Sequence, residues 1–309
     1  MVISLLFFYI ILIILFFLII SAVFYLFWLT FLKQNVGDIN NVDSEVNKPL
    51  EKYKELMRSG IEYINTQPHT WLYITSFDGL KLAARYYNNN SDKTIILVHG
   101  YRSTSTRDFS TAVKMYMNFG FNVLLCDQRC SGRSEGRIIT FGVKEHRDVL
   151  SWVDLIKNKY NTENIVLDGI SMGATTVLLA SEKAPKCVKR IVADCGFTSP
   201  VEIIKYVGKK YFKLNATLIL PILNLLCLIF GRFSIYNIST IDSLKNSDIP
   251  VLFVHGAADD FVPCEMSQRT YDSIIERARI IIVEGAGHGL SYFVDTERVE
   301  NELKSFLNF

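Results

Sequence analysis

The sequence predicts an α/β domain, built on a mostly parallel sheet with helices on both faces, preceded by one membrane-spanning helix. Residues 1–32 contain no charged side chain, so all 33 basic and 31 acidic residues follow them. The rest of the chain alternates short apolar runs with helix-length segments, which is typical of a parallel sheet buried on both faces. Catalytic residue types follow several of these runs, where the ligands of open parallel sheets bind.

The composition excludes two classes of protein. Half of the 309 residues are apolar, which rules out a disordered chain and supplies a large core. The formal net charge is +2, so nothing in the charge indicates a nucleic-acid partner. The six cysteines show neither a short-spaced disulfide framework nor zinc-ligand spacing, and we expect them to be free thiols in a reducing compartment.

The uncharged run at residues 1–32 is long enough to cross a bilayer, for which about 20 apolar residues suffice. A cleaved signal peptide is the alternative interpretation. Against it, no basic side chain precedes the run, and the small residues Ser21 and Ala22 lie inside it rather than after it. Lys33 and Lys48 follow the run, which favours a cytoplasmic domain under the positive-inside rule. We therefore expect a retained single-pass anchor.

A linker and a juxtamembrane helix are expected at residues 33–66, before a domain at 67–309. The first part is polar with mixed charge, and helical spacing of apolar residues follows it. Asp78-Gly79 lies between two strand-like runs and predicts a hairpin that opens the domain. Six apolar runs then predict the parallel strands; they are 94–98, 122–126, 164–167, 188–193, 251–254 and 279–283.

An insertion without a clear strand, at about residues 196–247, separates the fourth of these runs from the fifth. Its segment 214–230 is uncharged, which raises the alternative of a second membrane span. The segment is short for a span, and Pro221 and two asparagines interrupt it. We expect instead a pair of helices whose apolar face lines a pocket or touches lipid.

A nucleophile elbow is indicated by Gly169-Ile170-Ser171-Met172-Gly173, which fits the pattern G-x-S-x-G between an apolar strand and an apolar helix. An ordinary glycine-rich turn is the alternative, and the strand–turn–helix context disfavours it. A serine nucleophile needs a histidine base, and the histidine needs an acid that holds its tautomer. The stabilisation of an oxyanion needs two backbone N–H donors, which we expect from Met172 and from Tyr101 in the loop after residues 94–98.

The order expected in this architecture is serine, then acid, then histidine. His288 follows every acid candidate and lies in a glycine-rich loop after the last apolar run. Three acids stand near strand ends, namely Asp194, Asp259 and Asp260. Adjacent residues in one turn cannot both point at the same imidazole, so only one of the last two can serve.

These stretches together resemble the α/β-hydrolase superfamily, and within it the serine aminopeptidase and monoacylglycerol-lipase-like branch of bacterial hydrolases. The matching stretches are 98–101, 127–136, 169–173, 254–263 and 287–288. Cys130 stands where the family usually has glycine, and Ala257 where an acidic residue is common. The resemblance implies that Asp259 is the acid of the triad and that residues 196–247 form a cap over the active site.

The resemblance implies a serine hydrolase that cleaves carboxylic esters through an acyl-enzyme, with lipid or acylglycerol esters as one substrate class. It implies no metal or organic cofactor, and as partners only the ester substrate and the membrane. A serine aminopeptidase or amidase could use the same groups, and a non-catalytic binding protein is an alternative that the strained elbow disfavours. Because the anchor holds no strand-end residue, we expect a chain that begins near Lys48 to be soluble and active on short-chain esters.

Overall fold

The domain is built on one eight-stranded sheet. The computed structural model describes residues 2–35 and 37–308; Met1, Val36 and Phe309, which the predicted anchor, linker and domain include, lie outside the described residues. The strand order is β1-β2-β4-β3-β5-β6-β7-β8, in which β2 is antiparallel to β1 and β4 and the other pairs are parallel. The strands are β1 Thr70–Thr75, β2 Lys81–Tyr87, β3 Lys93–Val98, β4 Asn122–Asp127, β5 Asn164–Ile170, β6 Val188–Asp194, β7 Val251–Gly256 and β8 Ala278–Val283. The predicted mostly parallel sheet is confirmed.

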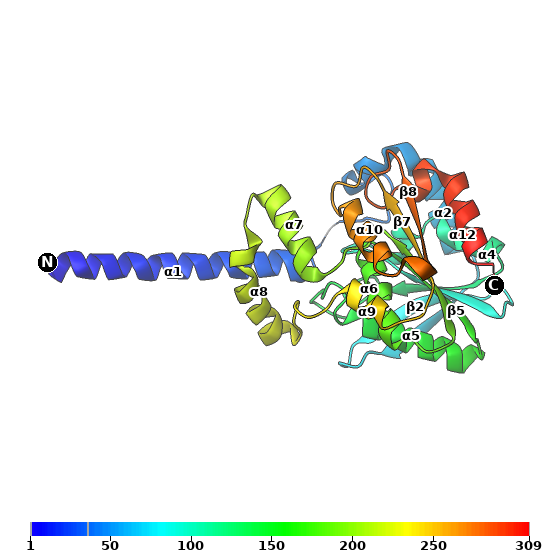
Figure 1. Ribbon diagram of the computed structural model, residues 1–309, viewed down its shortest axis with the longest axis horizontal. Coiled ribbons are helices and arrows are strands. Elements are labelled where there is room, and N and C mark those ends of the chain that lie inside the picture. The colour runs from blue at the N-terminus through cyan, green and yellow to red at the C-terminus, as the bar shows by residue number, and fades with distance from the viewer. Residues whose placement is uncertain (1, 36, 309) are drawn as a thin grey trace.

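Helices cover both faces of the sheet (Figure 1). The helices are α1 Val2–Phe31, α2 Lys54–Thr66, α3 Ser105–Asp108, α4 Ala112–Asn118, α5 Glu145–Tyr160, α6 Met172–Ala180, α7 Pro200–Phe212, α8 Leu220–Leu226, α9 Thr240–Lys245, α10 Cys264–Asp272, α11 Ser291–Val294 and α12 Thr296–Phe306. Shorter helical turns are η1 Glu45–Tyr53, η2 Ser181–Lys183, η3 Ala216–Leu218, η4 Cys227–Gly231 and η5 Ile275–Arg277.

Alternate residues of the strands supply the two cores, as the period of a β-strand requires. In β3, Ile96 packs with α5 and α6 on one face, where Trp152 is buried. Its neighbour Ile95 packs on the other face with α2, α4 and α12, where Tyr116 is buried. Because both faces are covered, β3 and β5 are built on the buried apolar runs 95–98 and 165–167.

The cap is helical, as predicted, and consists of α7, η3, α8 and η4. The uncharged segment 214–230 is not one continuous helix, because η3 and the start of α8 at Leu220 interrupt it. Pro221 lies in the first turn of α8, where its missing N–H costs no hydrogen bond. Among the described residues, α1 is the one helix that is long and apolar enough to cross a membrane, and the cap helix Leu220–Gly231 is shorter.

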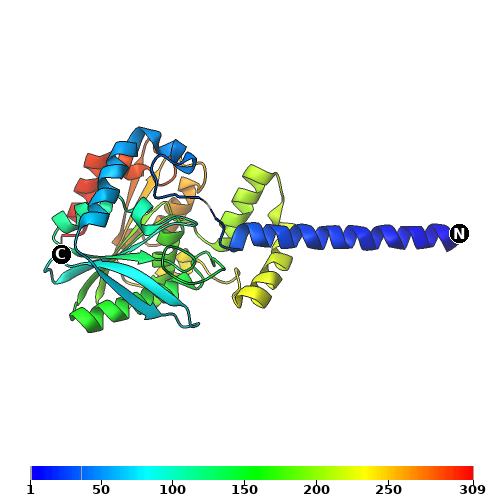
Figure 2. The ribbon, with the colours of Figure 1, turned by 180° about the vertical axis from the view of Figure 1, so that it is seen from behind.

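Helix α1 projects from the domain, and the cap helices flank its base (Figures 1 and 2). Its last turns are part of the protein interior, since Val23, Phe27 and Phe31 are buried at spacings of four residues. They form a third core with cap and domain residues, including Phe141 and Leu223. The last turns of the anchor predicted at residues 1–32 therefore also pack like a domain helix.

A short backbone junction joins α1 directly to the domain. Leu32 forms an antiparallel bridge with Ile138, and the N–H of Ile139 donates to the carbonyl oxygen of Phe31 at 2.7 Å. The hydroxyl of Tyr101 donates to the carbonyl of Thr30 at 2.7 Å, and the guanidinium of Arg102 donates to Leu29 and Leu32 at 2.6 and 3.0 Å. These bonds satisfy carbonyls that a helix end leaves without partners.

Candidate active site

Ser171 lies in a strained turn between β5 and α6. Its backbone has φ +56° and ψ −118°, a left-handed conformation that costs a non-glycine residue on the order of 1–3 kcal/mol. A side-chain carbon added at Gly173 would lie 1.8 Å from the carbonyl oxygen of Val98, and one at Gly169 would lie 2.3 Å from Gly173. The two glycines of the G-x-S-x-G pattern are therefore required by close approach of the backbone. The turn holds the serine hydroxyl at the carboxyl edge of the sheet.

The structure brings Ser171, His288 and Asp259 together in one hydrogen-bonded chain. The Nε2 atom of His288 lies 2.9 Å from Oγ of Ser171. Its Nδ1 atom lies 2.7 Å from Oδ2 of Asp259. The three side chains come from the ends of β5 and β7 and from the loop after β8. An edge-on contact with the ring of Phe261, with 5.1 Å between ring centroids, packs the imidazole in place.

The carboxylate of Asp259 is fully buried and accepts hydrogen bonds at both oxygens. Its Oδ1 accepts from the N–H groups of Phe261 and Val262 at 2.9 and 2.8 Å. Burial alone pushes the pKa of Asp259 upward, but hydrogen bonds from His255 and His288 outweigh it and hold that pKa well below the usual range of a carboxyl. Asp259 is therefore ionised throughout the neutral range.

The two other acid candidates lie in different surroundings. Burial raises the pKa of Asp194 to about 7, and its Oδ1 has no hydrogen-bond partner among the described residues. The backbone carbonyl of Asp194, by contrast, accepts from the N–H of Ser171 at 2.7 Å and so supports the elbow. The side chain of Asp260 is 78% exposed and lies 3.8 Å from the ammonium of Lys210.

His255 is a further residue of this site, outside the predicted catalytic residues. It is fully buried at the end of β7, with Nδ1 2.7 Å from Oγ of Ser267. Its Nε2 lies 3.0 Å from the carbonyl oxygen of Val262 and 3.2 Å from Oδ2 of Asp259. It thus holds the same carboxylate oxygen that faces His288. The available signal was its position at a strand end, inside the stretch 254–263 that carries the resemblance.

The two residues expected to donate to an oxyanion lie beside the serine. Met172 is the first residue of α6, so its N–H is among those that a helix start leaves without an intrahelical acceptor. Tyr101 follows Gly100, whose backbone packs so closely that an added side-chain carbon would lie 3.3 Å from Cβ of Ser171. Asp108 holds this loop by accepting the N–H of Gly100 at 2.8 Å.

Cys130, the departure from the family pattern, adopts a conformation that glycine adopts without strain. Its φ is +70°, in the left-handed region. The side chain is nevertheless buried, and burial raises the pKa of the thiol to about 12. The cysteine therefore contributes to packing at the cost of backbone strain.

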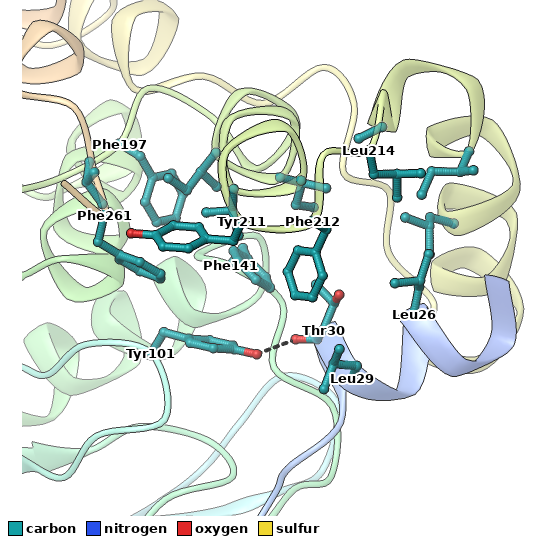
Figure 3. A pocket seen from close by; sticks show the side chains of 18 of the residues that line it. Leu26, Leu29, Thr30, Tyr101, Phe141, Phe197, Tyr211, Phe212, Leu214 and Phe261 are labelled. Atoms are coloured by element: carbon teal, nitrogen blue, oxygen red, sulfur yellow. Dashed lines mark hydrogen bonds between the residues drawn. The ribbon is translucent and has the colours of Figure 1, made fainter. Parts of the chain in front are cut away.

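Ser171 lies between two cavities. The larger, of about 490 Å³, is bounded by the cap, the loop after β3 and helix α1, and its walls are almost entirely apolar (Figure 3). The smaller, of about 180 Å³, is lined in part by the polar side chains of Ser103, Arg107 and Asp108. The serine hydroxyl can therefore meet a substrate that places an apolar group on one side and a more polar group on the other.

Helix α1 forms part of the wall of the larger cavity through Leu26, Leu29 and Thr30. Figure 3 shows Leu26 opposite Leu214 of the cap and Thr30 next to Phe212, with the hydroxyl of Tyr101 bonded to the carbonyl oxygen of Thr30. The expectation that a chain beginning near Lys48 is soluble and active on short-chain esters stays a prediction, and the structure adds a consideration to it. Such a chain would lack part of the cavity wall and would expose the apolar partners of Phe27 and Phe31.

Cys195, Asp259 and His288 also bring three potential metal-ligand atoms within 4.8 Å of one another. In the present arrangement, both imidazole nitrogens and both carboxylate oxygens already make hydrogen bonds within the site. Burial raises the pKa of the Cys195 thiol well above its usual value, so the sulfur carries its proton. The group is therefore arranged as a hydrogen-bonded chain beside a neutral thiol.

Two family models match the chain. The model described as serine aminopeptidase, S33, matches residues 89–227, and the model described as TAP-like protein matches residues 236–308. Uncharacterized protein YqkD of Bacillus subtilis is 28% identical over 222 residues, which cover 71% of this chain and 72% of that protein. An (R)-3-hydroxydecanoyl-ACP:CoA transacylase of Pseudomonas putida is 26% identical over 264 residues, which cover 72% of this chain and 85% of that protein.

Solved structures share the fold. Esterase Pf2001 of Pyrococcus furiosus superposes with a TM-score of 0.64 at 26% identity, which covers 79% of this chain and 92% of that one. Est1E of Butyrivibrio proteoclasticus, in its structure with ferulic acid, superposes with a TM-score of 0.60 at 21% identity, over 76% of this chain and 97% of that one. The fold is that of the α/β-hydrolases, as the resemblance implied, and the family models together with the likeness to esterase Pf2001 support a hydrolase.

Proposed function

This chain has the α/β-hydrolase fold, and we propose that it is a serine hydrolase that cleaves carboxylic esters through an acyl-enzyme. The observation that carries the proposal is the hydrogen-bonded chain from Ser171 through His288 to Asp259, which begins at a strained elbow. Esterases among the solved structures with this fold favour the same reaction class.

In the proposed reaction, Ser171 Oγ attacks the ester carbonyl while His288 Nε2 accepts the hydroxyl proton. The ionised Asp259 accepts the Nδ1–H of His288, which keeps Nε2 free as a base and stabilises the imidazolium that forms. His288 then returns the proton to the departing alcohol, and the acyl group remains on Ser171. A water molecule, deprotonated by the same imidazole, releases the acid and restores the serine.

The negative charge on the carbonyl oxygen would be stabilised by the backbone N–H groups of Tyr101 and Met172. Donors aimed at a developing oxyanion are worth about 3–4 kcal/mol each, when one of them is removed from an enzyme of this type. Met172 adds the positive end of the α6 dipole. Apart from the substrate and the hydrolytic water, every group in the proposal is a side chain or a backbone N–H of this chain.

The cavities support an acyl ester over an amino-terminal peptide. The larger cavity would take the acyl group, because its walls are apolar. A peptidase of amino termini must bind a charged amine, and none of the described residues that line the larger cavity is acidic. In the smaller cavity the carboxylate of Asp108 already accepts from Gly100 and Ser103 and pairs with Arg107 at 3.1 Å. Lipid and acylglycerol esters, whose acyl chains are long and apolar, are the substrates that we propose.

We further propose that α1 anchors the enzyme in a membrane with the domain on the cytoplasmic side. Lys33 follows the uncharged helix directly, and the preceding residues carry no basic side chain. The free thiols that the structure has at all six cysteines are compatible with a reducing compartment.

The decisive experiment compares the parent with Ser171→Ala in the full chain. We expect the variant to lose labelling by a fluorophosphonate and to lose about a thousandfold or more in turnover of p-nitrophenyl butyrate. Ser151→Ala is the matched control, because Ser151 lies on α5 and, among the described residues, its hydroxyl bonds the carbonyl of Arg147 in the same helix. Undiminished hydrolysis by purified Ser171→Ala would refute the proposed nucleophile.

A further inference from the structure

Helix α1, the proposed anchor, also forms part of the wall of the proposed substrate cavity. Leu26 and Leu29 face the cavity from α1, while Phe27, between them, is buried against the cap. The ring of Phe24 contacts Phe230 of the cap at 6.0 Å between centroids. The apolar surface of the span therefore continues without a break onto the cap and into the cavity.

The length of α1 places the cap at the surface of a bilayer. The part of α1 ahead of Val23 is free of buried side chains in the described range, and it rises about 31 Å at 1.5 Å per residue. The hydrocarbon core of a bilayer is about 30 Å thick. The first residue of α1 that is buried in the protein thus coincides with the expected edge of the hydrocarbon.

The cap carries an unusual number of exposed large apolar side chains. We define the cap apolar surface by these residues: Phe212, Leu218, Leu225, Leu228, Ile229 and Phe230. Leu225, Leu228 and Ile229 follow helical spacing on one face of the segment Leu220–Gly231, whose opposite face is also apolar and is buried in the third core. In water, such a surface would be an aggregation risk, so it requires an apolar partner.

Basic side chains flank this surface. Lys205, Lys209 and Lys213 are exposed on α7 or at its end, and Arg232 is exposed just after η4. An apolar face with flanking lysines and arginines is typical of helices that lie in a membrane interface. The segment between α7 and α8 lies on the side of the cap that faces the free length of α1 (Figure 1). Apolar face, basic flanks and position all point to the bilayer as the partner.

Building on the proposed esterase function, we infer that the cap apolar surface rests in the bilayer and that the acyl chain of a membrane lipid enters the larger cavity directly from it. Leu26 and Leu29 of the anchor would contact that chain opposite Phe212, which lines the cavity although it is more than half exposed. The anchor would then select substrate as well as hold the enzyme at the membrane.

The cavity part is tested with the full chain in phosphatidylcholine vesicles. We expect Leu26→Trp and Leu29→Trp to lower the ratio of kcat/KM for p-nitrophenyl palmitate over butyrate by about tenfold or more, because the indole fills space that the longer chain needs. Leu18→Trp is the matched control, because Leu18 is 60% exposed on the free length of α1. Labelling of Ser171 by a fluorophosphonate and an unchanged thermal midpoint show that the fold and the triad are intact in each variant.

An unchanged ratio in both tryptophan variants would overturn the role of the anchor in the cavity. If Leu26→Trp or Leu29→Trp abolishes butyrate hydrolysis, the variant Leu29→Ala is used in its place. We expect Leu29→Ala to raise the KM for p-nitrophenyl palmitate alone. An unchanged KM for palmitate would overturn the inference. Loss of the proposed function has a different signature, because the parent itself would then fail to hydrolyse either ester.

The bilayer part is tested without any catalysis. Tryptophan is introduced by Leu218→Trp in the cap apolar surface, where Leu218 is 77% exposed, and by Ile275→Trp in η5, where Ile275 is 56% exposed, as the control. Vesicles of brominated phosphatidylcholine should quench the added emission of the first variant and leave that of the second unchanged. Equal quenching of both, or of neither, would refute contact between the cap and lipid.

Discussion

Replacing Asp259 by asparagine isolates the contribution of the carboxylate with almost no change in shape. The amide oxygen can still accept from the N–H groups of Phe261 and Val262, which now bond Oδ1. The amide nitrogen then takes the place of Oδ2 and faces Nδ1 of His288 at about 2.7 Å. Two donors cannot share that contact, so the imidazole must carry its proton on Nε2, where it can no longer accept the proton of Ser171.

We expect turnover to fall by roughly 10⁴-fold, the loss seen when the corresponding aspartate of a serine protease is changed in this way. That factor corresponds to about 5.4 kcal/mol of transition-state stabilisation. Asp260→Asn is the matched control, because its carboxylate is 78% exposed and its one ion pair, with Lys210, spans 3.8 Å. A surface pair of this kind is worth less than about 1 kcal/mol, so this variant should lose less than tenfold.

The assay is steady-state hydrolysis of p-nitrophenyl butyrate, accompanied by the thermal midpoint of each variant. Because the pKa of Asp259 lies well below the usual carboxyl range, the carboxylate is ionised at every pH of the assay. The difference between parent and variant should therefore persist at the highest pH at which the protein stays folded. A reversed pattern, with Asp260→Asn inactive and Asp259→Asn active, would move the acid by one residue. If only Asp194→Asn mattered, the acid would belong to β6.

Three further predictions concern the elbow, a buried carboxyl and the orientation. Gly173→Ala should abolish soluble expression or activity, because the added side-chain carbon would lie 1.8 Å from the carbonyl oxygen of Val98. The measurements are the thermal midpoint and the turnover of the variant. A fully active variant would contradict the elbow geometry. Burial raises the pKa of Asp168 to about 7, although the hydrogen bond from Tyr116 lowers it. The folded state therefore binds the proton of this carboxyl more tightly than the unfolded state does. The protein accordingly loses stability as the pH rises from about 4 to about 7. Asp168→Asn, which can still accept from Tyr116, should therefore raise the thermal midpoint more at about pH 8 than at about pH 4, and equal shifts would refute the assignment. Asp38→Cys in intact cells should react with a membrane-impermeant maleimide only after lysis, and labelling of intact cells would place the domain outside.

Much of the sheet could be predicted from the sequence because its signals are local. Each parallel strand contains a short apolar run that a polar residue follows directly, and the elbow around Ser171 has its two glycines within the motif itself. The resemblance then singled out Asp259 from three candidates, and that residue lies beside His288. These features depend on neighbours in the chain or on a fixed order of elements.

The packing of α1 could not be predicted, and the reason is physical. A helix that is apolar on every side carries no pattern that distinguishes a face in lipid from a face in protein, so Val23 and Phe27 look like any other residue of the span. His255 was missed for a related reason. Its role depends on a contact with Asp259 across a turn and on Ser267 in the next helix, which a strand-end position alone does not specify.

If α1 spans a membrane as proposed, the junction at Phe31 connects that span rigidly to the domain. Many anchored domains are joined to their span by a flexible linker. Here the side chains of Tyr101 and Arg102 donate hydrogen bonds to backbone carbonyls at the end of α1. The same loop contains Gly100, whose backbone packs against Ser171, and Tyr101, the proposed oxyanion donor. A long membrane-spanning helix changes its tilt with the thickness of the bilayer. Because α1 is bonded to this loop, a change in tilt would shift the position of the loop. The proposed activity of this chain would in that case depend on the thickness of the bilayer that holds α1.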